Sequence, residues 1–276
     1  MKQLAKGLVR KTGLRRAHVA SARMCCERNV LATVRLASIR LGNSGRQRAR
    51  TGGRILCYHS IGQPLWGVND VSPSQFRRQI ALALAAGYRI VPAAEIARTG
   101  GGPRDLAITF DDGLKSVLTT AAPVLAEYNA PWSLFVVSDW ADGKHAWDAD
   151  VMLDWREIER LAGAGVDIGS HSVTHPNFGL LDSSQVTDEI EQSRHTIAAR
   201  TGILPMTFAI PFGQSGNWSP LAAAAARDAG YTTVYAQAEE TRPAATVPRT
   251  FVTSWDNDRV FRAALAGAFD RWEEWV

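Results

Sequence analysis

Two short stretches contain the residues of this chain that are best suited to chemistry. One is TFDDG, which contains Asp111 and Asp112, and the other is GSHSVTH, which contains His171 and His175. One carboxylate (Asp112) and two imidazoles (His171 and His175) are a ligand set that suits a hydrolytic divalent metal. Such a site uses three protein ligands and leaves one coordination position for the attacking water. Because Asp111 remains available to move a proton, the two stretches predict a metal-dependent hydrolase.

The predicted strands before these stretches favour a metal site over the alternative of solvated acidic residues and structural histidines. Acidic pairs in loops are usually solvated, and a single histidine is more often structural than a ligand. Here, however, Leu106–Phe110 is an apolar run typical of a buried strand, and the acidic pair follows directly at its end. Val166–Gly169 precedes the two histidines in the same way. Because the carboxyl ends of parallel strands carry the chemistry in α/β folds, we expect the two stretches to meet at one edge of the sheet.

Four motifs in this order resemble the polysaccharide deacetylase family, also called carbohydrate esterase family 4 or the NodB homology domain. They are Thr109–Gly113, Trp155–Val166, His171–His175 and Phe208–Gly213. The likeness runs from about Ile55 to the C-terminal region. A Tyr-His pair after the first predicted strand is similar to the branch that deacetylates poly-N-acetylglucosamine and other exopolysaccharides.

The resemblance implies a fold, an activity and a cofactor. The fold is of the α/β class, a distorted (β/α)7-type barrel with mostly parallel strands. The alternation of about seven predicted strands and helices along the chain independently favours such a sheet. The activity is removal of N-acetyl groups from an N-acetylglucosamine-containing polysaccharide or oligosaccharide, with release of acetate. The cofactor is a divalent metal, with Zn²⁺ preferred and Co²⁺, Ni²⁺ or Fe²⁺ also compatible with the ligands.

Two family features are missing, and other residues are candidates for their roles. The family usually has an arginine beside the catalytic aspartate in its third motif, where this chain has Ala209. Arg249 either replaces it from a neighbouring strand or forms an unrelated structural ion pair. The usual Leu-x-His motif is also absent, because no histidine follows His195. His59, at the end of the first predicted strand, is therefore the candidate proton donor; the alternative is a loop histidine that caps the strand.

The third motif also supplies the expected oxyanion contact. By the resemblance, Pro211 and Phe212 lie at the substrate, and the backbone N–H of Phe212 stabilises the developing negative charge. Because the usual proton donor is missing, an O-acetyl esterase acting on xylan or another glycan is an alternative, since an alcohol leaves more readily than an amine. A carbohydrate-binding protein with a degenerate site is a second alternative, which the intact ligand set disfavours. Tryptophans in predicted loops could stack on sugar rings, and these are Trp66, Trp140, Trp147, Trp218 and Trp255.

The charge distribution divides the chain into two parts. The first 54 residues hold 14 of the 31 Lys and Arg residues and one of the 27 acidic residues, Glu27. This segment therefore carries a net charge of +13, and the rest of the chain carries −9. We predict a basic N-terminal extension over residues 1–52, either disordered or amphipathic, followed by a catalytic domain over residues 53–276.

The basic extension bears on location and partners. No apolar run in it is long enough for a signal peptide or a membrane span, so we expect a cytoplasmic protein. Near-helical spacing of apolar residues from Asn29 to Leu41, with arginines between them, makes peripheral contact of residues 1–50 with an anionic membrane a further possibility. The acidic domain and the lack of a recognised module argue against nucleic acid, so an acetylated glycan is the expected partner. The sequence gives no indication of the oligomeric state.

Overall fold

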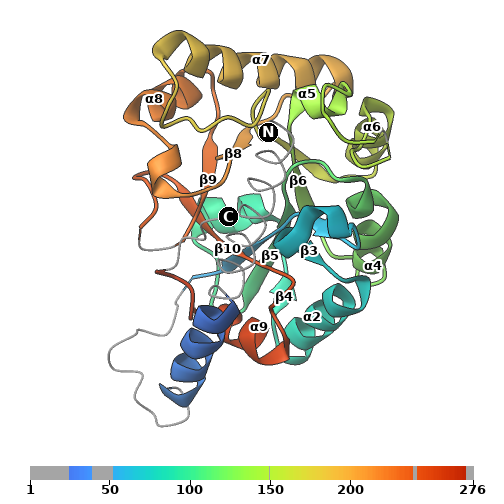
Figure 1. The fold of residues 1–276 in the computed structure, drawn as a ribbon, viewed down its shortest axis with the longest axis vertical. Coiled ribbons are helices and arrows are strands. Elements are labelled where there is room, and N and C mark those ends of the chain that lie inside the picture. The colour runs from blue at the N-terminus through green and yellow to red at the C-terminus, as the bar shows by residue number, and fades with distance from the viewer. Residues whose placement is uncertain (1–24, 39–51, 149, 239–240, 272–276) are drawn as a thin grey trace, which may run out of the picture.

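Parallel strands form the centre of the molecule (Figure 1). The computed structural model describes residues 25–38, 52–148, 150–238 and 241–271. The strands of the main sheet are β1 (Arg54–Tyr58), β4 (Arg89–Ile90), β5 (Asp105–Phe110), β6 (Trp132–Val136), β7 (Asp167–Ser170), β8 (Thr207–Ala209), β9 (Thr233–Gln237) and β10 (Val247–Phe251). They follow the order β1-β10-β9-β8-β7-β6-β5-β4, and an additional parallel pairing of β1 with β5 closes seven of them into a barrel. This closed parallel barrel confirms the predicted (β/α)7-type fold.

Helices cover the outside of the barrel (Figure 1). They are α2 (Pro73–Ala85), α3 (Ala93–Thr99), α4 (Ala122–Ala126), α5 (Ser138–Ala141), α6 (Trp155–Gly163), α7 (Ser183–Thr201), α8 (Pro220–Asp228) and α9 (Asp258–Leu265). Shorter elements are β2 (Ser60–Ile61), the 3-10 turn η1 (Pro64–Asn69), β3 (Asp70–Val71), the π-helical turn η2 (Val117–Ala121) and the 3-10 turn η3 (Ser215–Asn217). Capping boxes at Asp154 and Asp182 fix where α6 and α7 begin, because each aspartate accepts a backbone N–H of the first turn.

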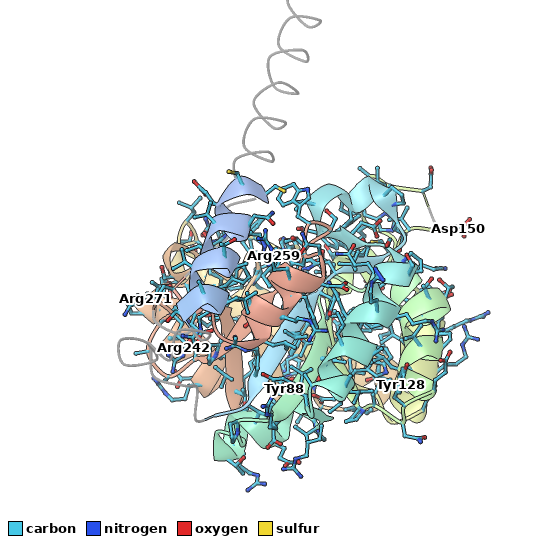
Figure 2. The ribbon with its side chains drawn as sticks, turned by 90° about the horizontal axis from the view of Figure 1, so that it is seen from below. Tyr88, Tyr128, Asp150, Arg242, Arg259 and Arg271 are labelled. Atoms are coloured by element: carbon cyan, nitrogen blue, oxygen red, sulfur yellow. The ribbon has the colours of Figure 1, made fainter. Side chains whose placement is uncertain are left out.

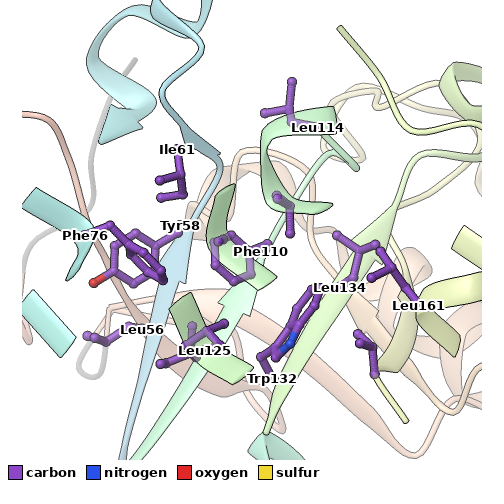
Figure 3. Packing of buried hydrophobic residues seen from close by; sticks show 14 of the residues in the cluster. Leu56, Tyr58, Ile61, Phe76, Phe110, Leu114, Leu125, Trp132, Leu134 and Leu161 are labelled. Carbon is purple, nitrogen blue, oxygen red and sulfur yellow. The ribbon is translucent and has the colours of Figure 1, made fainter. Parts of the chain in front are cut away.

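The alternation of side chains along the strands separates an outer core from the barrel interior. On β1, Leu56 and Tyr58 pack outward against helices, and Phe110 of β5 joins them. Figure 3 shows this outer core, in which Phe76 of α2 meets Tyr58 edge-on with ring centroids 5.2 Å apart. The residue before Leu56 on β1, Ile55, belongs instead to the cluster inside the barrel. Because successive residues of a strand face opposite sides, the odd-numbered positions of β1 and β5 point into the barrel.

The helix of residues 25–38 packs against α9, at the opposite end of the chain. Figure 2 shows the two side by side, with Arg259 of α9 at their contact. Arg259 donates hydrogen bonds to Asn29 Oδ1 at 2.7 Å and to Thr33 Oγ1 at 2.9 Å. Arg28 is fully buried and forms an ion pair with the buried Asp256, at 2.5 Å between Nη2 and Oδ2. Residues 25–38 therefore pack on the barrel domain as one of its helices.

This arrangement changes the interpretation of the basic extension. Disorder is not found for residues 25–38, while residues 1–24 and 39–51 lie outside the described residues. The arginine side of the helix is the buried side, because Arg28 and Arg35 face the domain whereas Val30 and Val34 are 56% and 62% exposed. Each buried guanidinium has an acceptor, since Arg35 donates to the Ala266 carbonyl at 2.8 Å. Among the described helices, none combines the length and the apolar character that crossing a membrane requires.

Candidate active site

Asp111 enters the barrel because it continues the inward-facing positions of β5. Ala107 and Thr109 face inward on this strand, and Asp111 follows two residues later. Asp111 is only 3% exposed. Arg249 of β10 also faces inward and donates two parallel hydrogen bonds to it, Nη1 to Oδ1 at 2.6 Å and Nη2 to Oδ2 at 2.7 Å. This bidentate geometry is the strongest that a carboxylate and a guanidinium form.

The pair has a definite charge state. Burial by itself would raise the pKa of Asp111, but the Arg249 guanidinium outweighs burial and holds this pKa below its ordinary value. Burial also works against the charge of Arg249, and the Asp111 carboxylate reverses that effect and raises the Arg249 pKa. Both groups are therefore charged at neutral pH. Arg249 thus forms the ion pair with Asp111. Ala209, at the position where the family usually has an arginine, has no charged group and could not form it.

Asp112, His171 and His175 converge beside this pair. Asp112 Oδ1 lies 3.6 Å from both His171 Nε2 and His175 Nε2. Two ligand atoms bound at about 2.05 Å in tetrahedral geometry would be about 3.3 Å apart. Asp112 Oδ1 is buried and lacks a hydrogen-bond partner among the described residues, which is costly unless a cation or water occupies the space between the three atoms. The donor set, its spacing and this unpaired oxygen fit a divalent metal.

A backbone contact orients one of the two imidazoles. His171 Nδ1 lies 2.8 Å from the carbonyl oxygen of Ala209 on β8, so this nitrogen carries the proton and donates. Nε2 then faces Asp112, and in the neutral ring it offers the lone pair that a metal ligand needs. Burial, and then the neighbouring His171, lowers the pKa of His175 to about 4, so that His175 is neutral at pH 7. Both rings are therefore ready to coordinate a cation.

Left-handed backbone conformations are concentrated at this site. Positive φ values occur at Asp112 (73°), Ser172 (73°), His175 (62°) and Phe212 (63°). Such conformations cost about 1–3 kcal/mol each for residues other than glycine, and they persist where the surrounding contacts enforce them. At Asp112 the turn breaks the strand alternation, and Asp111 and Asp112 consequently face different partners although they are adjacent in the chain.

The loop that carries His175 is held by α7. Glu189 accepts the backbone N–H groups of Val173 and Thr174 at 2.8 and 2.9 Å, and the Thr174 hydroxyl at 2.6 Å. The backbone N–H of His175 donates to Ser172 Oγ at 2.9 Å. The sequence analysis did not single out Glu189. Its sequence position, on a helix that starts after the histidine motif, gives no sign of this contact.

Cys57 and His59 approach Asp111 from β1 and the residue after it. Cys57 Sγ lies 3.4 Å from Asp111 Oδ2, and burial raises the pKa of this thiol well above its ordinary value, so that it donates as a neutral group. One side-chain atom each of Cys57 (sulfur), His59 (ring nitrogen) and Asp111 (carboxylate oxygen) lies within 4.8 Å of the other two. The His59 ring packs against Phe251 with centroids 4.9 Å apart. Burial lowers the His59 pKa despite the nearby carboxylates of Asp112 and Asp111, so this histidine is neutral at pH 7.

A cavity of about 350 Å³ extends over these groups, and its surface is mostly apolar. Its lining includes Trp66, Trp140, Trp147, Phe212 and Phe251, with the amides of Asn69, Gln214 and Gln237 between them. Apolar walls with a few polar groups are typical of small-molecule sites. Phe212 forms part of the wall, whereas Pro211 is buried and is not among the lining residues.

The structure divides the tryptophans that the sequence suggested as sugar platforms. Trp66, Trp140 and Trp147 line the cavity, and the ring of Trp140 stacks on His175 at 5.3 Å. The prediction that Trp218 could stack on a sugar ring is wrong. Trp218 is only 6% exposed and packs against Phe178 and Phe208 in a core cluster under α8. Its apolar neighbours, rather than a glycan, account for its position. Trp255 is half-buried and outside the cavity lining.

One family model and two proteins of known name match parts of this sequence. A family model described as polysaccharide deacetylase matches residues 99–234. The chain is 28% identical over 103 residues to a chitooligosaccharide deacetylase of Sinorhizobium fredii, covering 37% of this chain and 43% of that protein. It is 29% identical over 118 residues to the poly-beta-1,6-N-acetyl-D-glucosamine N-deacetylase of Escherichia coli K12, covering 37% of this chain and 18% of that protein. The chain thus spans less than half the length of either relative.

The fold comparison agrees with these matches. IcaB from Ammonifex degensii superposes with a TM-score of 0.64 at 24% identity, covering 78% of this chain and 98% of that chain. The family model includes both the Asp111–Asp112 stretch and the two histidines. By this sequence match, residues 99–234 belong to the polysaccharide deacetylase family, and the shared barrel agrees with that assignment.

Proposed function

We propose that the protein is a metal-dependent hydrolase that removes N-acetyl groups from N-acetylglucosamine units of an oligosaccharide or polysaccharide and releases acetate. The observation that carries the proposal is the convergence of Asp112, His171 and His175 around one unpaired oxygen, next to a charged Asp111, at the base of an apolar cavity. A structural metal site would be closed by a fourth protein ligand. Here Asp112 and His175 both line the cavity, which supports an open position on the cation.

Asp112, His171 and His175 would hold the cation, for which two imidazoles and a carboxylate favour Zn²⁺ over harder ions. When bound, the cation supplies Lewis acidity, which polarises the acetyl carbonyl and makes a nearby water more acidic. All remaining steps fall to groups of the chain. Asp111, ionised through Arg249, orients the water and accepts its proton as the oxygen attacks the carbonyl carbon.

His59 would complete the proton path. Because its pKa is lowered, the resting imidazole is neutral and must first receive a proton before it can act as an acid. Asp111 is within 4.8 Å of it and is the nearest carrier of the water's proton. The proton then passes from His59 to the sugar nitrogen while the C–N bond breaks, giving acetate and a free amine. Phe212 lines the cavity, and its backbone N–H would stabilise the oxyanion before that bond breaks.

The cavity suits an acetamido sugar. Indole and phenyl faces pack well against sugar rings, and amides between them can bind hydroxyl and acetamido groups. The two relatives described above are named for chitooligosaccharide and poly-β-1,6-N-acetylglucosamine, both of which consist of N-acetylglucosamine units. Their shared unit is the one that we propose as substrate.

One observation favours O-acetyl esterase activity as a second candidate. A buried, neutral His59 is a poor proton donor, and an alcohol leaves with much less help from an acid than an amine does. Hydrolysis of acetylated xylan would therefore tolerate this arrangement better than amide hydrolysis would.

Acetate release from chitooligosaccharide, poly-N-acetylglucosamine and acetylated xylan separates the candidates. The protein is assayed with added zinc, after chelation, and as the Asp111→Asn variant, with its metal content measured in each case. We expect zinc-dependent release from one or both N-acetylglucosamine substrates and loss of turnover in Asp111→Asn at unchanged metal content. Release from xylan alone would support the esterase. Glycan binding without any acetate release, at full metal occupancy, would instead indicate a carbohydrate-binding protein.

Peripheral membrane contact of residues 1–50 stays a proposal, and the exposed side of the N-terminal helix supports it. Val30 and Val34 are exposed on that side, and the preceding 24 residues contain seven Lys or Arg and no acidic residue. Sedimentation with vesicles containing phosphatidylserine should be weakened by the double variant Val30→Asp, Val34→Asp. Unchanged sedimentation would exclude this side of the helix. The cytoplasmic location also stays a prediction.

A further inference from the structure

The two oxygens of Asp112 have different surroundings. Oδ1 faces His171 and His175 and has no hydrogen-bond partner among the described residues. Oδ2 accepts a hydrogen bond from Trp66 Nε1 at 2.9 Å. One oxygen of the carboxylate is therefore directed at the cation position, and the other is occupied by an indole.

The indole is held in place by its own loop. Trp66 lies in η1, between β2 and β3, and its backbone N–H donates to the Gln63 carbonyl at 3.0 Å. The Gln63 side chain binds across to the Val151 carbonyl at 3.0 Å and to the Ser116 N–H at 2.7 Å. These contacts anchor the start of η1 to Ser116, four residues after Asp112, and to Val151. The loop that carries Trp66 is thus tied to the segment that begins with Asp112.

Aromatic packing extends the same support to a second ligand. The Trp66 ring contacts Trp147 at 4.8 Å and Trp140 at 6.4 Å between centroids. Trp140 in turn stacks on the His175 imidazole at 5.3 Å, with the ring planes 28° apart. Two of the three ligands therefore contact the tryptophan cluster of Trp66, Trp140 and Trp147.

We propose that Trp66 is a positioning residue that restricts Asp112 to coordination through Oδ1 alone. A carboxylate whose two oxygens are both free can bind a cation with both, which fills a coordination position that hydrolysis needs for water or the acetyl carbonyl. With Oδ2 engaged by Nε1, that position stays open. The proposal rests on the proposed metal site and deepens it, since it assigns to Trp66 a role different from stacking on a sugar.

The test compares three tryptophan-to-phenylalanine variants of the full chain. Trp66→Phe removes the N–H donor and keeps a ring. Trp147→Phe changes the same cluster but leaves the Trp66 donor in place. Trp155→Phe is the matched control away from the site, because Trp155 Nε1 also donates to an aspartate, Asp142, at 2.7 Å. Zinc affinity is measured by competition with a chelator, coordination by the visible spectrum of the cobalt(II) form, and folding by thermal unfolding of the metal-free proteins.

Trp66→Phe should bind zinc about 10- to 100-fold more weakly, as is typical when an outer partner of a metal ligand is lost. Its cobalt(II) bands should also weaken, because a higher coordination number gives less intense absorption. Trp155→Phe should keep the affinity and spectrum of the unchanged protein, and Trp147→Phe, which keeps the Trp66 donor, should lose much less affinity than Trp66→Phe. Wild-type affinity and spectrum in Trp66→Phe, or an equal loss in Trp147→Phe, would overturn the proposal. If Trp66→Phe does not fold, Trp66→Met, which fills the space without a donor, serves in its place.

This outcome can be told apart from failure of the proposed function. If the unchanged protein binds zinc but releases no acetate from any substrate, the proposed function fails while the affinity comparison still stands. If it binds neither zinc nor cobalt(II), both proposals fail.

Discussion

Arg249 allows a carboxylate to remain charged inside the barrel. A buried carboxylate without a partner would be neutral at pH 7, because burial disfavours the charged form. Here Arg249 reaches Asp111 from β10, the strand next to β1 in the barrel, although 137 residues lie between the two in the chain. The residue that the family usually has in the third motif is thus replaced, for this contact, by one on a later strand.

Arg249→Met should reduce acetate release about 100-fold at pH 7, a loss typical of an impaired proton acceptor. The wild-type pKa of Asp111 is held low by Arg249, and without it burial raises this pKa. Because the ionised form is active, the acidic limb of kcat/KM against pH should move to higher pH, and activity should partly recover as pH rises. Arg249→Lys, which keeps the charge, should show a smaller shift. An unshifted limb in Arg249→Met would show that Arg249 does not set the ionisation of Asp111.

His59→Ala tests the proton path. Amide turnover should fall about 100- to 10,000-fold, the range in which a general acid contributes, while zinc content stays the same. Hydrolysis of an activated acetyl ester should fall much less, because its leaving group does not need the proton. Equal losses on both substrates would indicate that His59 only shapes the cavity next to Phe251.

The sequence could predict which side chains meet where these residues lie directly after strands. Asp112, His171 and His175 were expected to meet, because parallel strands deliver their ends to one side of a sheet. It could not find Trp66, Cys57 or Glu189 as partners of these groups. Their contacts depend on the path of a loop, the inward alternation on β1 and the rotation of a helix, and none of these leaves a pattern in residue types.

Among the elements, α7 links the fold to the candidate metal ligands. Its capping box at Asp182 fixes the start of the helix, and the helix then presents Glu189 to the loop between β7 and His175. The predicted strand over Val166–Gly169 agrees with β7, which leads into this loop. The loop itself has positive φ values at Ser172 and His175, which residue types alone do not suggest.

Glu189→Ala should weaken zinc binding about 10-fold while the fold remains. The substitution leaves the N–H groups of Val173 and Thr174 without their acceptor, and hydrogen bonds to a charged group contribute about 1.5–3 kcal/mol each. The loop would then hold His175 less firmly. Chelator competition measures the affinity, and Glu191→Ala, an exposed residue on the same helix, is the control. If both variants bind zinc equally well, the loop does not depend on α7.

At the scale of the whole molecule, the two ends of the described chain support each other. The helix of residues 25–38 covers α9, and Arg28 binds both Asp256 and the carbonyl of Phe251, the last residue of β10. The basic composition of the N-terminal segment suggested a solvated or membrane-bound surface. Charge counts do not show whether an arginine has a buried partner more than 200 positions away, so the docking of this helix could not be predicted.

Arg28→Met should destabilise the molecule by about 3–5 kcal/mol, because it leaves the fully buried Asp256 charge without its partner. Chemical denaturation measures this loss, and Val30→Ala, on the exposed side of the same helix, should change the free energy of unfolding by less than about 0.5 kcal/mol. The double variant Arg28→Met, Asp256→Leu should recover much of the stability, since it removes the unpaired charge as well.

Because Phe251 lines the cavity and Arg249 lies on the same strand, acetate release should also fall in Arg28→Met at temperatures where the fold is intact. Unchanged stability in Arg28→Met would mean that the helix of residues 25–38 is not an integral part of the barrel domain.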